Sequence, residues 1–187
     1  MHAVPVFFAT TDGQTRRIAE YLVEALHRHG LDSVAVDLAS PQAGHVDWTP
    51  VRGVIVCASL HIGKHQAAAA RFVKANHQYL NVRPSAFFSV SLSAASQRAE
   101  EVEAARKIAR DFTEAAGWLP ARIACIPGRL AYAHYGWLKR WLMRRISAKE
   151  GGPTDTSRDW ELTRWEEVDR LADEMAREIR GQTAAIA

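Results

Sequence analysis

Apolar runs of strand length alternate with helical repeats along most of this chain of 187 residues. The runs span residues 4–9, 33–38, 51–58, 85–90 and 122–126. Between them, apolar residues recur every three or four positions over residues 18–26, 69–80 and about 97–116, as on one face of a helix. A last helix is expected from Thr163, which forms a capping-box pattern with Glu166. This alternation predicts a single α/β domain, 1–187, with a five-stranded, doubly wound parallel sheet.

Polar loops follow the first, third and fourth predicted strands, at residues 10–15, 59–65 and 91–95. Right-handed crossovers place these three loops at the same edge of the sheet. In open α/β sheets, ligands bind beyond the carboxyl ends of the strands, where the strand order reverses. Together the loops indicate a flat ligand that carries one phosphate group.

The first of these loops, Thr10–Thr15, has the composition of a phosphate site. Backbone N–H groups and the positive end of a helix dipole attract anions, and glycine allows a close approach of the backbone. The hydroxyls and the acid also suit a plain helix N-cap, which is the alternative interpretation. The chain has neither a GxGxxG dinucleotide motif nor a GxxxxGK[ST] triphosphate loop, so the pattern favours a phosphomonoester.

Composition limits the class of protein. An apolar content of 48% and a charged content of 24% are typical of a soluble globular domain. Cys57 and Cys125 lie within strand-like runs, which predicts free buried thiols in a reducing compartment and neither a disulfide framework nor a metal site. The chain shows no secretory pattern and no apolar window of about 18 residues, so we expect a cytoplasmic protein.

Residues 127–162 separate the fifth strand from the last helix and are too long for a simple connector. From Ala121 to Lys149 the chain carries seven of its 24 Lys and Arg and no acid, which leaves 17 basic and 21 acidic residues, a net of −4, elsewhere. Residues 137–146 are rich in Trp, Leu, Lys and Arg, as in helices that lie in a membrane interface. A helix packed on the domain and a nucleic-acid contact are the alternatives. The absence of acids favours an anionic partner, either lipid or substrate.

The strand, T-x-[TD]-G-x-T loop and helix at residues 10–15 resemble the FMN phosphate loop of flavodoxins. A closer resemblance, over nearly the whole chain, is to the flavodoxin-like, quinone-dependent protoporphyrinogen IX dehydrogenases of bacterial haem synthesis. It is carried by Thr11–Arg16, Ile18-Ala19, Ala58-Ser59, Pro84–Val90, Trp118-x-Pro120, Gly128-x-Leu130-x-Tyr132, Gly151-Gly152-x-Thr154-Asp155-Thr156 and the helix led by Trp160 and Trp165. In the second loop the family can show basic and tyrosine residues, whereas this chain has His61, Ile62 and His65.

The resemblance implies a flavodoxin-like fold with FMN as cofactor, protoporphyrinogen IX as substrate and a membrane quinone as electron acceptor. The implied cofactor-binding residues are Thr10, Thr11, Asp12, Gly13, Gln14, Thr15, Ser59, Leu60, His61, Ile62, Gly63, Ser91, Leu92 and Ser93. On the substrate side we expect Arg129, Tyr132, His134, Tyr135 and Lys139. The basic aromatic segment implies a protein bound peripherally to the cytoplasmic face of the inner membrane, through residues 137–146. It implies no nucleic acid as partner. No catalytic acid or base is assigned.

Two other functions share this fold. A flavodoxin-type electron carrier typically presents a strongly acidic docking face, which the basic insertion argues against. An NAD(P)H:quinone reductase is the second alternative, although the chain offers no nucleotide-specific motif. The two alternatives differ from a porphyrinogen dehydrogenase in what reduces the flavin.

Overall fold

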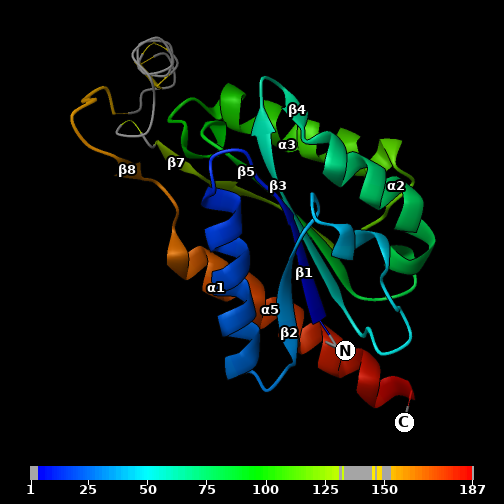
Figure 1. Cartoon of the computed structure of the whole chain (residues 1–187). Coiled ribbons are helices and arrows are strands. Elements are labelled where there is room, and N and C mark those ends of the chain that lie inside the picture. The colour runs from blue at the N-terminus through cyan, green and yellow to red at the C-terminus, as the bar shows by residue number, and fades with distance from the viewer. Residues whose placement is uncertain (1–3, 131, 133–144, 146, 149–152, 187) are drawn as a thin grey trace.

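The computed structural model describes residues 4–130, 132, 145, 147–148 and 153–186. Its parallel strands are β1 (Val4–Ala9), β2 (Ser33–Asp37), β3 (Val54–His61), β5 (Ser85–Ser91) and β6 (Arg122–Pro127). They lie in the order β2-β1-β3-β5-β6, so the chain starts inside the sheet and winds outward in both directions (Figure 1). This order confirms the predicted doubly wound, flavodoxin-like sheet.

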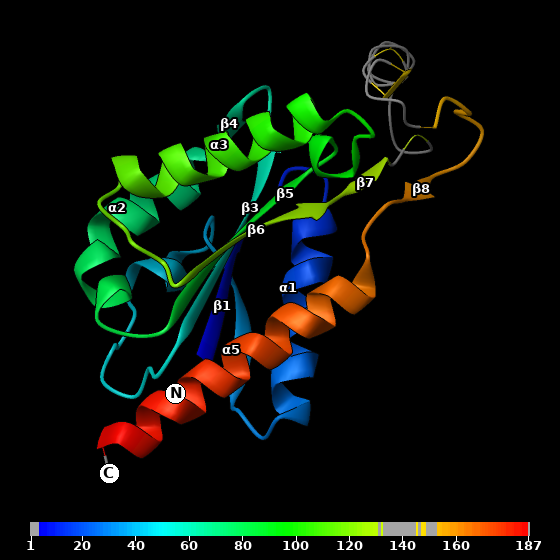
Figure 2. The ribbon, with the colours of Figure 1, turned by 180° about the vertical axis from the view of Figure 1, so that it is seen from behind.

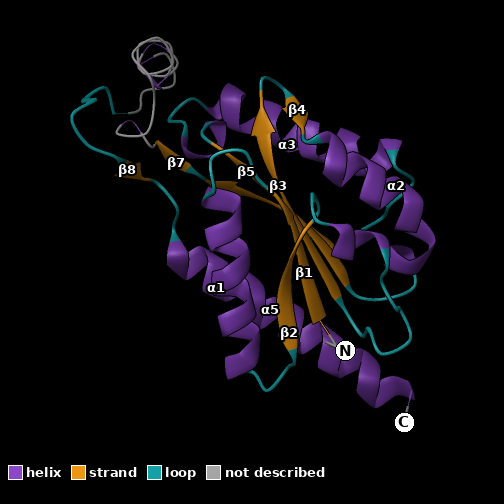
Figure 3. Cartoon of the chain, viewed as in Figure 1, coloured by secondary structure: helices purple, strands orange, loops and turns teal. Residues whose placement is uncertain are grey.

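Helices cover both faces of the sheet. The helices α1 (Gln14–Arg28) and α5 (Trp165–Ile186) lie on one face, and α2 (Ala67–Asn81) and α3 (Ala99–Ala115) lie on the other (Figures 1 and 2). Two short 3₁₀ helices, η1 (Pro41–Gly44) and η2 (Ser93–Ala95), lie in the connections (Figure 3).

The apolar runs form strands that are buried on both sides. Successive side chains of a strand point to opposite faces. In β1, Val6 and Phe8 therefore pack with α1 and α5, whereas Phe7 and Ala9 pack with α2 and α3. A strand between two helical layers has no polar face, which explains the near-continuous apolar runs.

The third strand differs from its predicted span. It begins at Val54 rather than Val51 and runs to His61, so that it includes part of the loop expected at 59–65. Its end pairs antiparallel with β4 (Lys64–His65), and Ile62 and Gly63 form the turn with φ values of 49° and 72°. Two-residue hairpin turns of this type need positive φ at both positions. Isoleucine rarely adopts it, so the sequence did not reveal the hairpin.

His65 of this hairpin is partly buried and packs against aromatic side chains. Its ring centroid lies 5.1 Å from that of Phe87 and 4.7 Å from that of Phe112. Its Nε2 atom is 2.9 Å from Ser89 Oγ. Burial lowers the pKa of His65 to about 4, so the imidazole is neutral near pH 7. His65 is one of the residues that depart from the family pattern, and the structure packs it against Phe112 of α3.

The capping box expected at Thr163 is wrong. Helix α5 begins at Trp165, and the hydroxyl of Thr163 instead donates a hydrogen bond of 2.8 Å to the carbonyl oxygen of Pro127. Glu166 and Glu167 lie in the first turn of the helix, where their charge favours the helix dipole. Thr163 thus ties the end of the insertion to its beginning.

Both cysteines are free thiols, as predicted; Cys57 is buried in β3 and Cys125 is half-buried in β6. Burial raises the pKa of both thiols. Within the described part of the chain, no helix combines the length and the apolar content needed to cross a bilayer.

We predict that His65 makes the folded protein sensitive to mild acid. Between pH 6.5 and pH 4 the unfolded chain binds a proton at this histidine that the folded protein excludes, so stability falls as the pH falls through that range. In urea unfolding at pH 7.5 and pH 5, His65→Phe should lose less free energy of unfolding than the wild type. The difference is expected on the order of 1 kcal/mol. An equal loss in both proteins would contradict this assignment.

Candidate functional site

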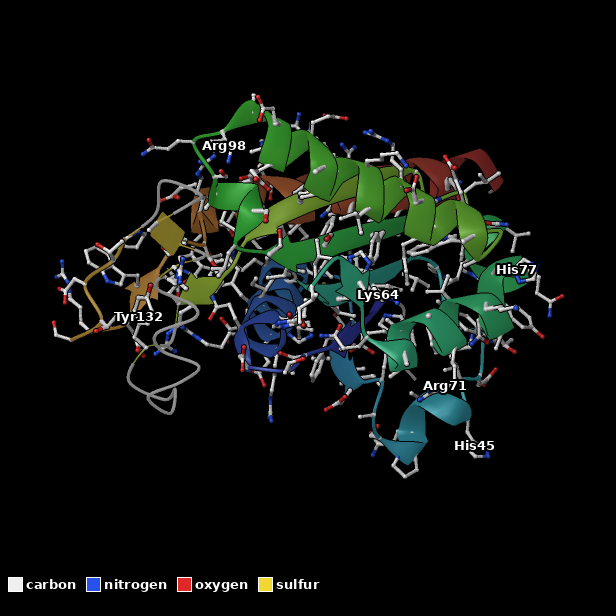
Figure 4. The ribbon with its side chains drawn as sticks, turned by 90° about the horizontal axis from the view of Figure 1, so that it is seen from above. His45, Lys64, Arg71, His77, Arg98 and Tyr132 are labelled. Carbon is white, nitrogen blue, oxygen red and sulfur yellow. The ribbon has the colours of Figure 1, made fainter. Side chains whose placement is uncertain are left out.

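The register of the sheet brings the predicted loops together. Ala9 lies beside Ala58, Ala58 beside Ser89, and Ser89 beside Cys125, so the strands end at one edge. A cavity of about 440 Å³ lies at this edge. Figure 4 looks down on this end of the molecule, with Lys64 on the hairpin, Arg98 ahead of α3 and Tyr132 next to the described ends of the insertion. The cavity is lined by Thr10, Asp12, Gln14, Thr15, Ser59, Leu60, His61, Ile62, Gly63, Val90, Ser91, Leu92, Ser93, Glu101, Ala104, Ala105, Ile108, Gly128 and Arg129.

The phosphate loop lies at the N-terminus of α1. Gly13 is the N-cap residue, with a φ of 86°, and no side chain caps the helix. The hydroxyl of Thr15 is buried, with the residue only 1% exposed, and it has no hydrogen-bond partner among the described residues. The hydroxyl of Thr10 accepts a 3.0 Å hydrogen bond from the N–H of Gly13 and so holds the loop in shape. Because the N-cap residue is a glycine, it provides no side-chain cap, which favours the anion site over the plain N-cap interpretation.

Gln66 connects this loop to β3. Its Nε2 atom donates a 3.1 Å hydrogen bond to the hydroxyl of Thr11 and another to the hydroxyl of Ser59. Its Oε1 atom is buried without a partner in the described part of the chain. Thr11 thus supports the loop through Gln66. The sequence pattern does not point to Gln66, because it predicts an open loop where the structure has a hairpin that places this residue between β4 and α2.

The remaining walls of the cavity come from two sides. The hairpin residues Leu60–Gly63 face residues 91–93, which lead from β5 into η2. Ile62 at the tip of the hairpin is fully exposed. Helix α3 adds Glu101, Ala104, Ala105 and Ile108, none of which was predicted. A helical repeat shows which face is apolar, but it does not show that this face extends beyond the sheet into a cavity.

The insertion meets the cavity at its base. Strand β7 (Arg129–Leu130) pairs antiparallel with β8 (Trp160–Glu161), and the N–H of Gly128 donates a 3.0 Å hydrogen bond to the carbonyl of Ser91. Arg129 lines the cavity and forms an ion pair with Asp159. The beginning of the insertion is therefore part of the wall that holds the ligand.

Tyr132 was expected on the substrate side, but it does not line the cavity. It is fully buried with Leu130, and its hydroxyl donates a 3.1 Å hydrogen bond to the carbonyl of Pro153. A buried tyrosine with this bond holds two parts of the insertion together rather than presenting its ring to a substrate. His134, Tyr135, Lys139 and nearly all of segment 137–146 lie outside the described residues.

The residues present fit a ligand with a phosphomonoester. A partnerless buried hydroxyl, that of Thr15, and an uncapped helix end point to an anion that accepts several hydrogen bonds. The lining away from this loop includes apolar side chains such as Leu60, Leu92 and Ile108, which suit a flat aromatic ring. Among the described residues, no group of three or more His, Cys, Asp or Glu is placed to hold a metal ion.

Comparison with known proteins agrees with this geometry. The model of the family "Flavodoxin domain" matches residues 5–157. Protoporphyrinogen IX dehydrogenase [quinone] of Escherichia coli (strain K12) is 35% identical over 174 residues, which cover 91% of this chain and 93% of the relative. The protein of the same name from Leishmania major is 30% identical over 91% of this chain and 73% of its own length.

Solved structures support the fold alone, because their sequences are distant. Oxidised flavodoxin 1 from Bacillus cereus superposes with a TM-score of 0.55 at 14% identity, over 93% of this chain and 97% of that one. A flavodoxin from Streptococcus pneumonia gives a TM-score of 0.54 at 14% identity, over 96% of this chain and 98% of that one. Together with the family match, these structures confirm the predicted fold and support FMN as the cofactor. The chain therefore belongs to the flavodoxin-like family of quinone-dependent protoporphyrinogen IX dehydrogenases.

Proposed function

We propose that this protein is an FMN-dependent oxidoreductase of haem biosynthesis that converts protoporphyrinogen IX to protoporphyrin IX and passes the electrons to a membrane quinone. One observation carries the proposal: the phosphate loop and the base of the insertion line the same cavity. A generic flavodoxin domain needs only the phosphate loop and the ring site, whereas an enzyme with a large substrate also needs residues that line the substrate side of the cavity. The relatives named above match over nearly the full length of the chain, insertion included.

In this proposal, two groups of described residues bind the phosphate and the ring of FMN at the two ends of the cavity. Thr10, Thr15 and the first N–H groups of α1 hold the phosphate, and residues 59–63 and 91–93 flank the ring. The bound flavin supplies the redox chemistry, accepting hydrogen from the substrate and giving it up to the quinone. The protein binds the ring, orients it and shields it with the hairpin and η2.

Arg129 is the described residue best placed on the substrate side. Its side chain is 29% exposed at the edge of the cavity, and Asp159 holds the guanidinium there. A porphyrinogen carries propionates, and arginine recognises carboxylates in a bidentate manner. His134, Tyr135 and Lys139 are proposed to add to this side.

The basic aromatic segment 137–146 supplies the contact with the membrane in this proposal, which assigns the protein to the cytoplasmic face of the inner membrane. Its Trp and Leu residues suit the lipid interface, and its Lys and Arg suit anionic headgroups. A membrane quinone resides in lipid, so an enzyme that reduces it gains from such a contact.

The decisive assay follows porphyrin fluorescence under anaerobic conditions, with FMN-loaded protein, protoporphyrinogen IX and a quinone. We expect rapid fluorescence growth that requires the quinone. The variant that lacks residues 137–146 should be slower while still binding FMN. Flavin that binds but is reduced only by NAD(P)H would identify a reductase instead. Flavin that exchanges electrons only with a protein partner would identify a carrier.

Thr15→Val should weaken FMN binding, because it removes the partnerless hydroxyl from the phosphate loop and keeps the shape of the side chain. A hydrogen bond to a charged group contributes about 1.5–3 kcal/mol, so the Kd should rise roughly 10- to 100-fold. Quenching of flavin fluorescence gives the Kd. Thr113→Val is the matched control: Thr113 is similarly buried, but its hydroxyl bonds to Arg110 within α3. Equal affinities of the two variants would count against the loop.

Binding to lipid vesicles should depend on both charge and segment 137–146. The full chain should sediment with vesicles that contain anionic lipid, and less so with neutral vesicles or at high salt, because salt screens exposed charges. Deletion of residues 137–146 should reduce sedimentation severalfold. Unchanged sedimentation after the deletion would assign the membrane contact elsewhere.

A further inference from the structure

Gln14, the first residue of α1, bonds to the far end of the insertion rather than to its own loop. The residue is 7% exposed. Its Nε2 atom donates a 2.8 Å hydrogen bond to Glu161 Oε1 in β8 and a 2.9 Å hydrogen bond to the hydroxyl of Thr163. A buried amide that bonds over such a distance in sequence links two parts of the site directly.

The same cluster holds both ends of the insertion. Glu161 Oε2 accepts a 2.9 Å hydrogen bond from Arg17, one turn along α1. Thr163 donates to the carbonyl of Pro127, the last residue of β6. Gln14 and Arg17 therefore contact the point where the chain returns from the insertion, and Thr163 links that point to the end of β6.

The cluster also reaches the substrate side. Glu161 lies opposite Arg129 in the pairing of β8 with β7. Glu161 itself does not line the cavity, whereas Arg129 does. Strand β8 thus connects the contacts of α1 to a residue of the cavity wall. Gln14 stands between Gly13 and Thr15, so a shift of the phosphate loop acts on the same contacts.

We propose that Gln14 and Glu161 form a latch that couples occupancy of the phosphate loop to the position of the insertion. The proposal rests on the proposed function, since it takes FMN as the occupant of the loop. A phosphate bound at the first turn of α1 restrains this turn and with it the amide of Gln14, which holds β8 in place. Coupling between two sites is reciprocal, so fixing β8 also strengthens the binding of FMN. Glu161 is a positioning residue, since it lies outside the cavity.

The test measures the Kd of FMN in full-length Gln14→Ala, Glu161→Ala and the double variant. Glu161 lies at the surface, with its side chain 32% exposed, so its variant should fold. We expect Glu161→Ala to raise the Kd at least about 5-fold, although Glu161 lies outside the cavity. Each substitution also removes a second hydrogen bond, that of Gln14 with Thr163 or that of Arg17 with Glu161. The double variant should therefore raise the Kd by less than the product of the two single effects, because the Gln14–Glu161 bond is lost in both single variants.

The control is Arg28→Ala, which breaks a comparable pair with Asp169 that also joins α1 to a later element but lies at the other end of the helix. Its Kd should equal that of the wild type. If Gln14→Ala weakens the binding of FMN and Glu161→Ala does not, Gln14 acts on the ligand directly and the proposed latch is wrong. A wild type that binds no FMN would overturn the proposed function, and the latch with it.

Trypsin gives a second readout that does not depend on activity. The insertion carries Lys139, Arg140, Arg144 and Arg145, all trypsin sites. In the wild type, saturating FMN should slow cleavage at these sites severalfold. In Glu161→Ala, saturating FMN should leave the cleavage rate nearly unchanged. Equal protection in both proteins would overturn the latch while leaving FMN binding intact.

Discussion

The parallel pairing of β1, β3 and β5 is the constraint on which the rest of the molecule depends. Its register places the carboxyl ends of three strands at one edge of the sheet, so that loops separated by up to about 80 residues meet around one cavity. The pairing is possible because both faces of these strands are apolar and are covered by helices. Burial of the sheet thus offsets the cost of a polar, partly unsatisfied edge.

The edge of the sheet that carries the cavity has several features that lower local stability in the absence of a ligand. The first helix has no side-chain cap, Thr15 has no partner among the described residues, and Ile62 holds a β-branched side chain at positive φ. Each feature is unfavourable in the free protein. All three lie around one cavity, where a bound phosphate and ring can offset them.

The insertion extends this edge into a larger site. Arg129 joins the cavity wall, Asp159 orients it, and Gln14 with Glu161 fixes the returning strand to α1. A flavodoxin-like domain that acts on a large substrate needs both a flavin pocket and a surface beside it. Here the start of α1 and the end of the insertion share one polar cluster, so hydrogen bonds join two parts of the structure around the cavity.

The pattern of the sequence alone determined the five parallel strands and the edge of the sheet at which the loop of residues 10–15 lies, because periodicity and loop chemistry are local. Only the tertiary structure decided the hairpin around Ile62, the packing of His65 against Phe87 and Phe112, the bridge through Gln66 and the hydrogen bond by which Thr163 ties the insertion to β6. Each of these depends on a partner that local spacing does not reveal. A side chain's spacing in sequence gives its face of an element, but its bonding partner follows only once the elements have packed.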